Sequence, residues 1–244
     1  MKKFVIVIPS YQNSQWFEKN LGSVLAQNYE QFRVIYVDDC SPDGTGNLVE
    51  KYLEANNFSH KVKLIKNSQR VGAMENLYQM IRSCEDDEII VTLDGDDWLA
   101  HPDVLTKLDQ VYSDPNVWMT YGQYRSWPDN AIGCCKQIPN EVIERNGFRT
   151  YQWCSSHLRT YYTWLFKRIP KEDFLGPDGK IVPMTWDLYK MFPMLEMSGY
   201  RSKFIPDVLY IYNVETPIND SKVNLQLQQS LERVIRAKPK YARL

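Results

Sequence analysis

Residues 88–97 read Glu-Ile-Ile-Val-Thr-Leu-Asp-Gly-Asp-Asp and join an apolar run to three carboxylates. The run Glu88–Leu93 is short and rich in β-branched residues, which predicts a strand. The cluster Asp94–Asp97 begins where that strand ends. Because ligands of open parallel sheets bind outside the carboxyl ends of the strands, this stretch predicts both a buried strand and a functional position.

Upstream of this stretch, similar apolar runs alternate with amphipathic helical patterns. The expected strands are Phe4–Ile8, Arg33–Val37 and Val62–Ile65, and the expected helices are one capped by Asn13 or Ser14, one capped by Asp43 and one over Gly72–Ile81. Alternation at this spacing implies right-handed crossovers between parallel strands. The sequence therefore predicts an α/β fold: a single Rossmann-like domain with a mostly parallel central sheet and helices on both faces.

The regular alternation of predicted strands and helices ends after about residue 115. A strand is expected at Val117–Tyr121, and the following stretch, Gln123–Ser155, is rich in Pro, Asn, Gly and Cys. A long irregular stretch inside a compact domain is usually functional or mobile. Further on we expect helices over Ser156–Thr163, Thr185–Met197 and Ser221–Arg236 and strands over Arg201–Ile205 and Val208–Tyr212.

Composition excludes several classes of protein. The formal charge is −1, which argues against a nucleic-acid partner, since such proteins usually carry a strong basic excess. No window reaches the ~18 consecutive apolar residues of a transmembrane segment. The five cysteines form no CxxC pair and no secretory signal is apparent, so we expect reduced thiols. These features favour a cytoplasmic or cytosol-facing enzyme, or a lumenal one if the chain is cut from a larger secretory protein.

Two acidic clusters follow strands of the predicted sheet, at Asp38-Asp39 and at Asp94–Asp97. Carboxylates that converge on one sheet edge repel each other unless a cation or a donor-rich ligand compensates them. Oxygen ligands without a Cys/His set favour Mg²⁺ or Mn²⁺, completed by water and substrate phosphates. A turn and a helix cap remain the alternative interpretation for Asp38-Asp39.

Taken in order, the motifs resemble glycosyltransferase family 2, the inverting nucleotide-sugar transferases of the glycosyltransferase-A fold. Its P-x-Y-N, V-D-D-x-S-x-D-G-T, N-x-G-x-x-x-A-x-N and D-x-D-D motifs are similar to residues 9–12, 37–45, 67–76 and 94–97. Gln12 replaces the Asn of the first motif. The resemblance covers residues 3 to about 115 closely and the remainder loosely. It implies a single domain, 1–244, with a nucleotide-binding half (1–115) and an acceptor-binding half (116–244) that ends in a helix.

The resemblance implies roles for the residues that match the motifs. Pro9, Tyr11 and Asp39 would surround the base of a uridine-type nucleotide, and Arg70 is a candidate for the nucleotide or its phosphates. The D-x-D motif would hold Mn²⁺ or Mg²⁺. Asp96 would be the main metal ligand, Asp94 would lie near the ribose or in the metal shell, and Asp97 could replace Asp96.

The implied reaction needs a base on the opposite side of the sugar from the leaving nucleotide. The family often places an acidic residue at the start of a late helix, and Thr185-Trp186-Asp187 resembles that position with Trp in place of Glu. Asp187 is therefore the expected base, with a helix N-cap as the structural alternative. Trp186 is a candidate for stacking on the sugar, because sugar rings have apolar faces.

Other residues are candidates for acceptor or diphosphate contacts. His157 and Arg159 could reach the diphosphate or a third metal position. Trp127 and Asp129 lie in the irregular stretch, where acceptor loops are expected. Tyr212-Asn213 ends a late strand. Cys134 and Cys135 form no metal pattern with a histidine and are interpreted as structural.

The leading hypothesis is an inverting, metal-dependent transfer of a hexose from a UDP-sugar to a hydroxyl of a glycan, lipid or protein side chain. One alternative is a catalytically degenerate domain that binds nucleotide-sugars. Another is a nucleotidyltransferase, which would need a basic, Gly-rich phosphate loop after the first strand. The chain has Ser10–Asn13 at that place.

Overall fold

The computed structural model describes residues 1–217, 222 and 224–244. The described residues contain an eight-stranded sheet with the strand order β3-β2-β1-β4-β7-β6-β8-β5. The strands are β1 (Phe4–Ser10), β2 (Phe32–Asp38), β3 (Val62–Lys66), β4 (Ile89–Thr92), β5 (Trp98–Leu99), β6 (Met119–Trp127), β7 (Arg159–Tyr162) and β8 (Ser202–Asn213).

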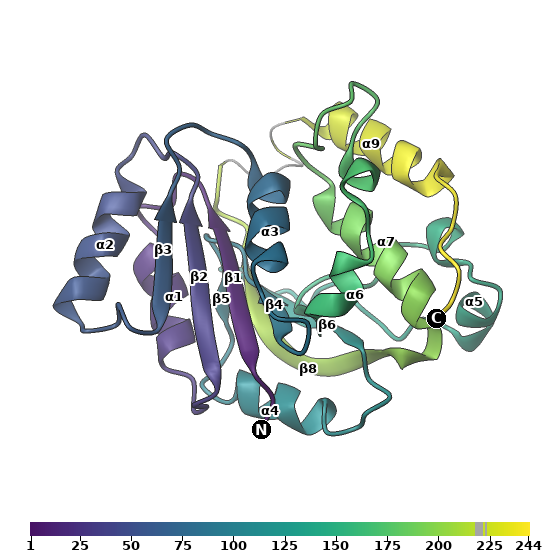
Figure 1. The fold of residues 1–244 in the computed structure, drawn as a ribbon, viewed down its shortest axis with the longest axis horizontal. Coiled ribbons are helices and arrows are strands. Elements are labelled where there is room, and N and C mark those ends of the chain that lie inside the picture. The colour runs from purple at the N-terminus through teal and green to yellow at the C-terminus, as the bar shows by residue number, and fades with distance from the viewer. Residues whose placement is uncertain (218–221, 223) are drawn as a thin grey trace.

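Strands β3, β2, β1 and β4 are parallel neighbours, as expected from the first half of the sequence. In the second half β6 and β8 pair parallel, whereas β7 is antiparallel to β4 and β6, and β5 is antiparallel to β8. Helices lie on both faces of this curled sheet (Figure 1). The predicted α/β fold, a mostly parallel central sheet with helices on both faces, is confirmed.

The helices α1 and α2 lie at one end of the molecule, and α7 and α9 lie together at the other (Figure 1). The α-helices are α1 (Phe17–Leu25), α2 (Thr45–Ala55), α3 (Ala73–Arg82), α4 (Val104–Val111), α5 (Asn140–Glu144), α6 (Thr163–Lys167), α7 (Trp186–Ser198) and α9 (Leu225–Ala237), with short 3-10 turns at Phe148–Thr150, Lys171–Phe174 and Gly199–Arg201.

Side chains that alternate along each strand divide the core into two layers. Val5 and Val7 of β1 pack in the layer that contains α3, α6 and α7. Phe4, Ile6 and Ile8 pack in the opposite layer, which contains α1, α2 and α4. Strands buried on both faces explain the uninterrupted apolar runs of the sequence.

One predicted element is of the wrong type. Residues 156–163 were expected to be helical, but the segment contains β7, which lies between β4 and β6. Thr160 pairs with Val91 on one side and with Thr120 on the other. Thr and Tyr favour extended backbone that packs on both faces, and pairing with two neighbours outweighs weak local helical periodicity.

The expected helix caps also differ. Trp16 precedes α1, and neither Asn13 nor Ser14 caps it with a side chain. The side chain of Asn13 instead donates to Ser10 Oγ, while its carbonyl accepts from the backbone of Phe17. The N-cap residue of α2 is Gly44 rather than Asp43, but Asp43 lies directly before it and accepts from the backbone N–H of Thr45, the first residue of the helix.

The second half is more regular than the sequence suggested. The expected strand at 117–121 is part of β6, which continues to Trp127, and the two expected strands over 201–212 form one strand, β8. The last helix, α9, begins at Leu225, and the earlier part of its predicted range contains residues that lie outside the described ones. None of the helices in the described ranges 1–217 and 224–244 could cross a membrane.

Candidate active site

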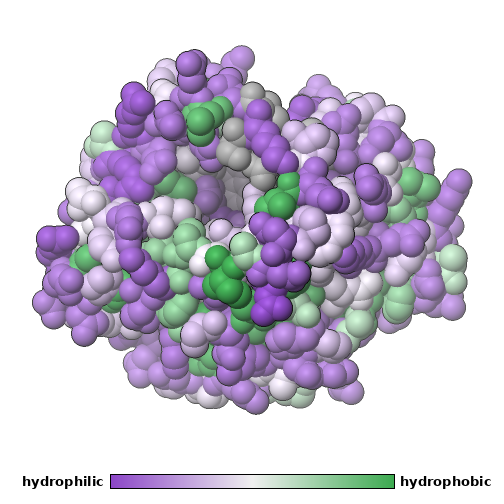
Figure 2. All heavy atoms as spheres, turned by 180° about the vertical axis from the view of Figure 1, so that it is seen from behind, coloured by the Kyte–Doolittle hydropathy of each residue, from purple (hydrophilic) through white to green (hydrophobic). Residues whose placement is uncertain are grey.

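A cleft of about 600 Å³ opens at the carboxyl ends of β1, β2 and β4. Figure 2 shows a hollow in the upper middle of one face, with mainly hydrophilic residues around it. Eleven of the predicted site residues line the cleft: Pro9, Tyr11, Asp39, Arg70, Asp94, Asp96, Asp97, His157, Arg159, Trp186 and Asp187. The structure thus brings together residues from both halves of the chain.

The turn Asp94–Asp97 is pressed against the end of β1. A Cβ atom on Gly95 would lie 2.6 Å from Nδ2 of Asn13 and 2.7 Å from Oγ of Ser10. These distances are too short for any side chain, so glycine is required at this position. The backbone N–H of Gly95 donates to the carbonyl of Pro9 at 3.2 Å, which fixes the turn to the floor of the cleft.

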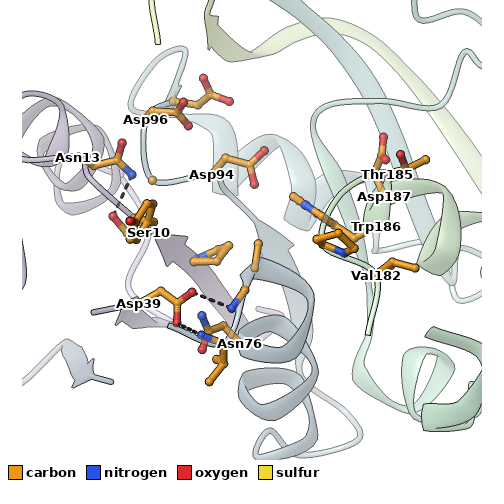
Figure 3. Close-up of a pocket in the computed structure, with 18 of the residues that line it drawn as sticks. Ser10, Asn13, Asp39, Asn76, Asp94, Asp96, Val182, Thr185, Trp186 and Asp187 are labelled. Atoms are coloured by element: carbon orange, nitrogen blue, oxygen red, sulfur yellow. Dashed lines mark hydrogen bonds between the residues drawn. The ribbon is translucent and has the colours of Figure 1, made fainter. Parts of the chain in front are cut away.

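Asp39 lies at the end of β2 and is held by donors from the loop before α3. One carboxylate oxygen accepts from Asn67 Nδ2 at 2.8 Å and from the Val71 N–H at 2.9 Å, and the other accepts from the Gly72 N–H at 2.8 Å. Burial opposes ionisation, but these hydrogen bonds outweigh it and lower the pKa of Asp39. Figure 3 shows Asp39 and Asn76 close together at the bottom of the cleft.

Two further residues lie beside Asp39 in the cleft, and only one of them, Arg70, was given a role from the sequence. Arg70 lies over the ring of Tyr11, with 3.8 Å between the guanidinium carbon and the ring centroid. Asn76, which the motif contained but to which no role was given, is buried, and its Nδ2 has no hydrogen-bond partner among the described residues. The sequence offered one indication that Asn76 lies near Asp39, which is its place at the end of the N-x-G-x-x-x-A-x-N motif.

Asp94, Asp97 and His157 form a group that could hold a metal ion. One potential ligand atom of each lies within 4.8 Å of the others. Oδ1 of Asp94 is buried without a hydrogen-bond partner in the described part of the chain, whereas Asp97 accepts from the hydroxyl of Tyr210 at 2.5 Å and from the N–H of Asn213 at 2.7 Å.

Electrostatics in this group favour a bound cation. Burial, followed by repulsion from Asp96 and Asp94, raises the pKa of Asp97 well above its usual value. Burial and Asp94 raise the pKa of Asp96 to about 6. Burial, Arg159 and Lys190 lower the pKa of His157, which favours the neutral imidazole. Asp96, the expected main ligand, lies outside the group of three, and its role stays a prediction.

Arg159 connects the two halves of the cleft. Its Nη1 lies 3.4 Å from Oδ2 of Asp187, and its Nη2 lies 3.8 Å from Oδ2 of Asp94 and 2.8 Å from Nδ1 of His157. Figure 3 shows Asp94 and Asp187 on opposite walls of the cleft. Asp187 lies in the first turn of α7, while Thr185 occupies the N-cap position, so the capping alternative for Asp187 is wrong.

Two buried residues next to the cleft were missed in the sequence. Lys190 of α7 is fully buried; its Nζ lies 4.6 Å from the ring centroid of Trp186 and 3.3 Å from Oγ1 of Thr92. Tyr210 of β8 is also fully buried. Tyr210 cannot be told from the other aromatic residues of its strand by any local pattern. Lys190 could have been noticed as a lysine within the apolar pattern of α7.

Two candidates do not line the cleft. Trp127 packs against Trp16 and Trp98, each with 5.5 Å between ring centroids, and Lys19 lies over its ring. Asp129 accepts from the N–H of Ala131 in the turn after β6. Their predicted acceptor contacts therefore gain no support from the cleft.

The remaining candidates lie where they were placed or nearby. Tyr212 lines the cleft, and Asn213 contributes its backbone N–H to Asp97. Cys134 is exposed and Cys135 is buried, and both are free thiols. Within the described residues neither belongs to a group that could hold a metal.

Comparison with known proteins identifies the family. The model of the family described as Glycosyl transferase family 2 matches residues 5–169. Poly(ribitol-phosphate) beta-N-acetylglucosaminyltransferase TarS from Staphylococcus aureus is 31% identical over 120 residues, which cover 47% of this chain and 20% of TarS. The Escherichia coli glucosyltransferase WfgD, which uses UDP-Glc and an α-D-GlcNAc-diphosphoundecaprenol acceptor, is 24% identical over 66% of this chain and 67% of WfgD.

Solved structures show the same fold. The crystal structure of S. aureus TarS in complex with UDP-GlcNAc has a TM-score of 0.72 at 19% identity and covers 96% of this chain and 65% of that one. The mannosyltransferase PcManGT from Pyrobaculum calidifontis, in complex with GDP-Man and Mn²⁺, has a TM-score of 0.64 at 18% identity, with 96% and 62% covered. In the sequence comparison, the matched part of this chain covers only a fifth of the length of TarS. With a family match over most of its length, the chain belongs to glycosyl transferase family 2.

Proposed function

We propose that this chain is an inverting glycosyltransferase that moves a hexose from a UDP-sugar to a hydroxyl acceptor with the help of Mn²⁺ or Mg²⁺. The observation that carries the proposal is the cleft itself, in which Arg159 lies between Asp94 on one wall and Asp187 on the other. A nucleotide pocket around Asp39 adjoins the first wall.

The nucleotide part of the donor would bind at the ends of β1 and β2. An ionised Asp39 accepts a hydrogen bond from the N–H of a uracil ring, and Tyr11 with Arg70 supplies a flat, cationic surface beside it. The unpartnered Nδ2 of Asn76 is a further donor for a carbonyl of the base.

The donor set of the acidic turn fits a divalent cation. The unpartnered Oδ1 of Asp94 and the raised pKa values of Asp96 and Asp97 mark an excess of buried negative charge. Carboxylates with a neutral imidazole suit Mn²⁺ better than Mg²⁺, which prefers oxygen ligands. Asp94, Asp97 and His157 would hold the ion, with Asp96 as the alternative ligand from the same turn. When bound, the ion neutralises charge on the diphosphate.

Asp187 would act on the acceptor. It accepts the proton of the acceptor hydroxyl as that oxygen forms a bond to the anomeric carbon. The bond from the anomeric carbon to the phosphate oxygen breaks, and its electron pair leaves with the diphosphate. A single displacement of this kind inverts the anomeric centre. Trp186, which lines the cleft beside Asp187, would offer its ring to the apolar face of a sugar.

The relatives support a hexose donor and a hydroxyl acceptor. TarS has been solved with UDP-GlcNAc, and WfgD is named for UDP-Glc. Their named acceptors are a poly(ribitol-phosphate) and an α-D-GlcNAc-diphosphoundecaprenol. The five free thiols fit a cytosol-facing location for this chain.

The test is a screen of UDP-glucose, UDP-galactose, UDP-GlcNAc and UDP-GlcA for Mn²⁺-dependent hydrolysis and binding. We expect one donor to be hydrolysed slowly without acceptor and EDTA to stop the hydrolysis. Binding of UDP with Mn²⁺ but no turnover of any donor or acceptor would favour the degenerate binding domain. If no nucleotide sugar were bound or hydrolysed, the proposal would fail.

A further inference from the structure

Tyr210 contacts every member of the group Asp94, Asp97 and His157. Its hydroxyl lies 2.5 Å from Oδ2 of Asp97 and 3.4 Å from Oδ2 of Asp94, and its ring is stacked on His157 with 4.3 Å between centroids and 18° between planes. Tyr210 is fully buried and is not among the residues that line the cleft. Its influence on the cleft therefore passes through the residues that it contacts.

The hydroxyl of Tyr210 has a single proton, so it can donate a hydrogen bond to only one of the two carboxylates at a time. The shorter distance assigns that proton to Asp97, so the hydroxyl does not donate to Asp94 at the same time. Its oxygen also accepts from the backbone N–H of Asp94 at 3.3 Å. Tyr210 thus fixes the turn at both of its ends, at Asp94 and at Asp97, while Oδ1 of Asp94 has no hydrogen-bond partner among the described residues.

The ring of Tyr210 sets the plane of the third member. His157 is stacked on two rings, that of Tyr210 and that of Tyr212, the latter with 5.4 Å between centroids and 23° between planes. The edge of the imidazole, which carries both nitrogens, is thereby held in one plane. Nη2 of Arg159 lies 2.8 Å from Nδ1 of His157 and 3.4 Å from its Nε2, and His157 as a whole lies in the cleft wall.

A role in packing alone would not explain the hydroxyl. Phenylalanine could fill nearly the same volume in β8, and a hydroxyl removed from water needs a partner to offset its desolvation. Here the partners are the carboxylate and the backbone of one turn, 113 and 116 residues away in the chain. Groups that orient metal ligands from behind typically change metal affinity by 10–100-fold when they are removed.

We propose that Tyr210 is a positioning residue for the cation site, which holds Asp94, Asp97 and His157 in the arrangement that a divalent ion requires. The inference rests on the proposed function, since it assumes that this group binds the ion.

The test is the affinity of the purified protein for Mn²⁺, measured by titration calorimetry in the presence of UDP and without any sugar donor. The variant is Tyr210→Phe, which keeps the ring against His157 and removes the hydroxyl. The matched control is Tyr29→Phe, because Tyr29 also donates to a carboxylate, that of Asp109 at 2.8 Å, near the start of β1 and far from the cleft. UDP binding in EDTA and thermal melting are recorded for both variants.

We expect Tyr210→Phe to bind Mn²⁺ about tenfold or more weakly than the wild type, with UDP binding in EDTA unchanged, and Tyr29→Phe to bind Mn²⁺ as the wild type does. Equal Mn²⁺ affinity of Tyr210→Phe and the wild type would overturn the role of Tyr210 while leaving the proposed function intact. A wild type that binds no Mn²⁺ would overturn both.

A second variant covers the case in which Tyr210→Phe does not fold. Asp97→Asn removes the charge that Tyr210 positions and keeps one of the two side-chain oxygens that accept from Tyr210 and from the N–H of Asn213. We expect it to fold and to bind Mn²⁺ at least tenfold more weakly. Unchanged Mn²⁺ affinity in Asp97→Asn would show that the carboxylate held by Tyr210 does not serve the ion, and the inference would be wrong.

Discussion

For some side chains in and beside the cleft a role can be predicted from their position in the sequence, and for others it cannot. Asp39, Asp94 and Asp187 each follow a strand or open a helix, and such positions predict function because element ends meet at one sheet edge. Asn76, Lys190 and Tyr210 lie within regular elements, where most side chains pack in the core. Their roles depend on partners far away in the sequence, which no local pattern indicates.

At this scale, Asp187→Asn should separate binding from catalysis. The amide cannot take a proton from the acceptor, so transfer should fall about 10²–10⁴-fold. Mn²⁺-dependent binding of UDP should stay within twofold, because Asp187 is on the opposite wall. The control is Asp207→Asn, an exposed carboxylate paired with Lys107. Full transfer activity in Asp187→Asn would remove it as the base.

Ionised Asp39 should increase the free energy of unfolding at neutral pH but not at strongly acidic pH. Its folded-state pKa lies below the unfolded value of about 3.9, so its contribution is present above that pH and is lost as the pH falls through the folded pKa. Asp39→Asn should therefore lower the free energy of unfolding at pH 7 by about 1.5–3 kcal/mol, and less at pH 3. Urea denaturation at both pH values measures this; an equal loss at both would contradict the ionic role.

Whole elements show where tertiary context decides. Segment 156–163 was expected as a helix, yet β7 forms there because β4 and β6 provide hydrogen bonds on both sides. The same strand carries Arg159 into the cleft and places His157 just before it. Helix α7 was predicted within one residue of its start, since its apolar pattern is long and Thr185 precedes it.

Helix α7 buries Lys190, and the cost of that burial predicts a stabilising substitution. Burial, together with repulsion from Arg159, lowers the pKa of Lys190. Burying the charged ammonium group lowers the free energy of unfolding. This loss is absent above the unfolded-state pKa of about 10.4, where the lysine is neutral in both states, and it grows as the pH falls towards the pKa of Lys190 in the folded protein.

Lys190→Met should therefore raise the free energy of unfolding at pH 7 by about 1 kcal/mol or more, with a smaller gain at pH 10. The control, Lys203→Met on the exposed edge of β8, should change it by less than about 0.5 kcal/mol. Thermal melting at both pH values provides the measurement. A loss of stability at pH 7 would show that Lys190 is paired more favourably than its contacts indicate.

Across the whole molecule, one buried ion pair joins the last helix to the body. Arg149 donates to both carboxylate oxygens of Glu196, at 2.6 and 2.9 Å, and to the carbonyl of Ile235 in α9 at 2.6 Å. Both side chains are buried. Helix α9 in turn contributes the carbonyl of Gln228 that accepts from Thr185, the residue before α7.

Glu196→Ala should leave the Arg149 charge buried without its partner and lower the free energy of unfolding by about 3–5 kcal/mol. Glu232→Ala is the control, since Glu232 forms a surface pair with Arg236 within α9 that is worth about 0.3–0.5 kcal/mol. Guanidinium denaturation compares the two variants. Similar small losses in both would mean that the buried pair does not hold α9 in place.

The sequence by itself determined the parallel half of the sheet and the carboxylates at its edge. Strand periodicity is local, and the carboxyl ends of successive parallel strands must meet. Only the tertiary structure decided that β7 completes the sheet, that Arg159 lies between Asp94 and Asp187, and that Tyr210 contacts Asp94, Asp97 and His157. These contacts join residues up to 116 positions apart, and they form only when distant strands pair.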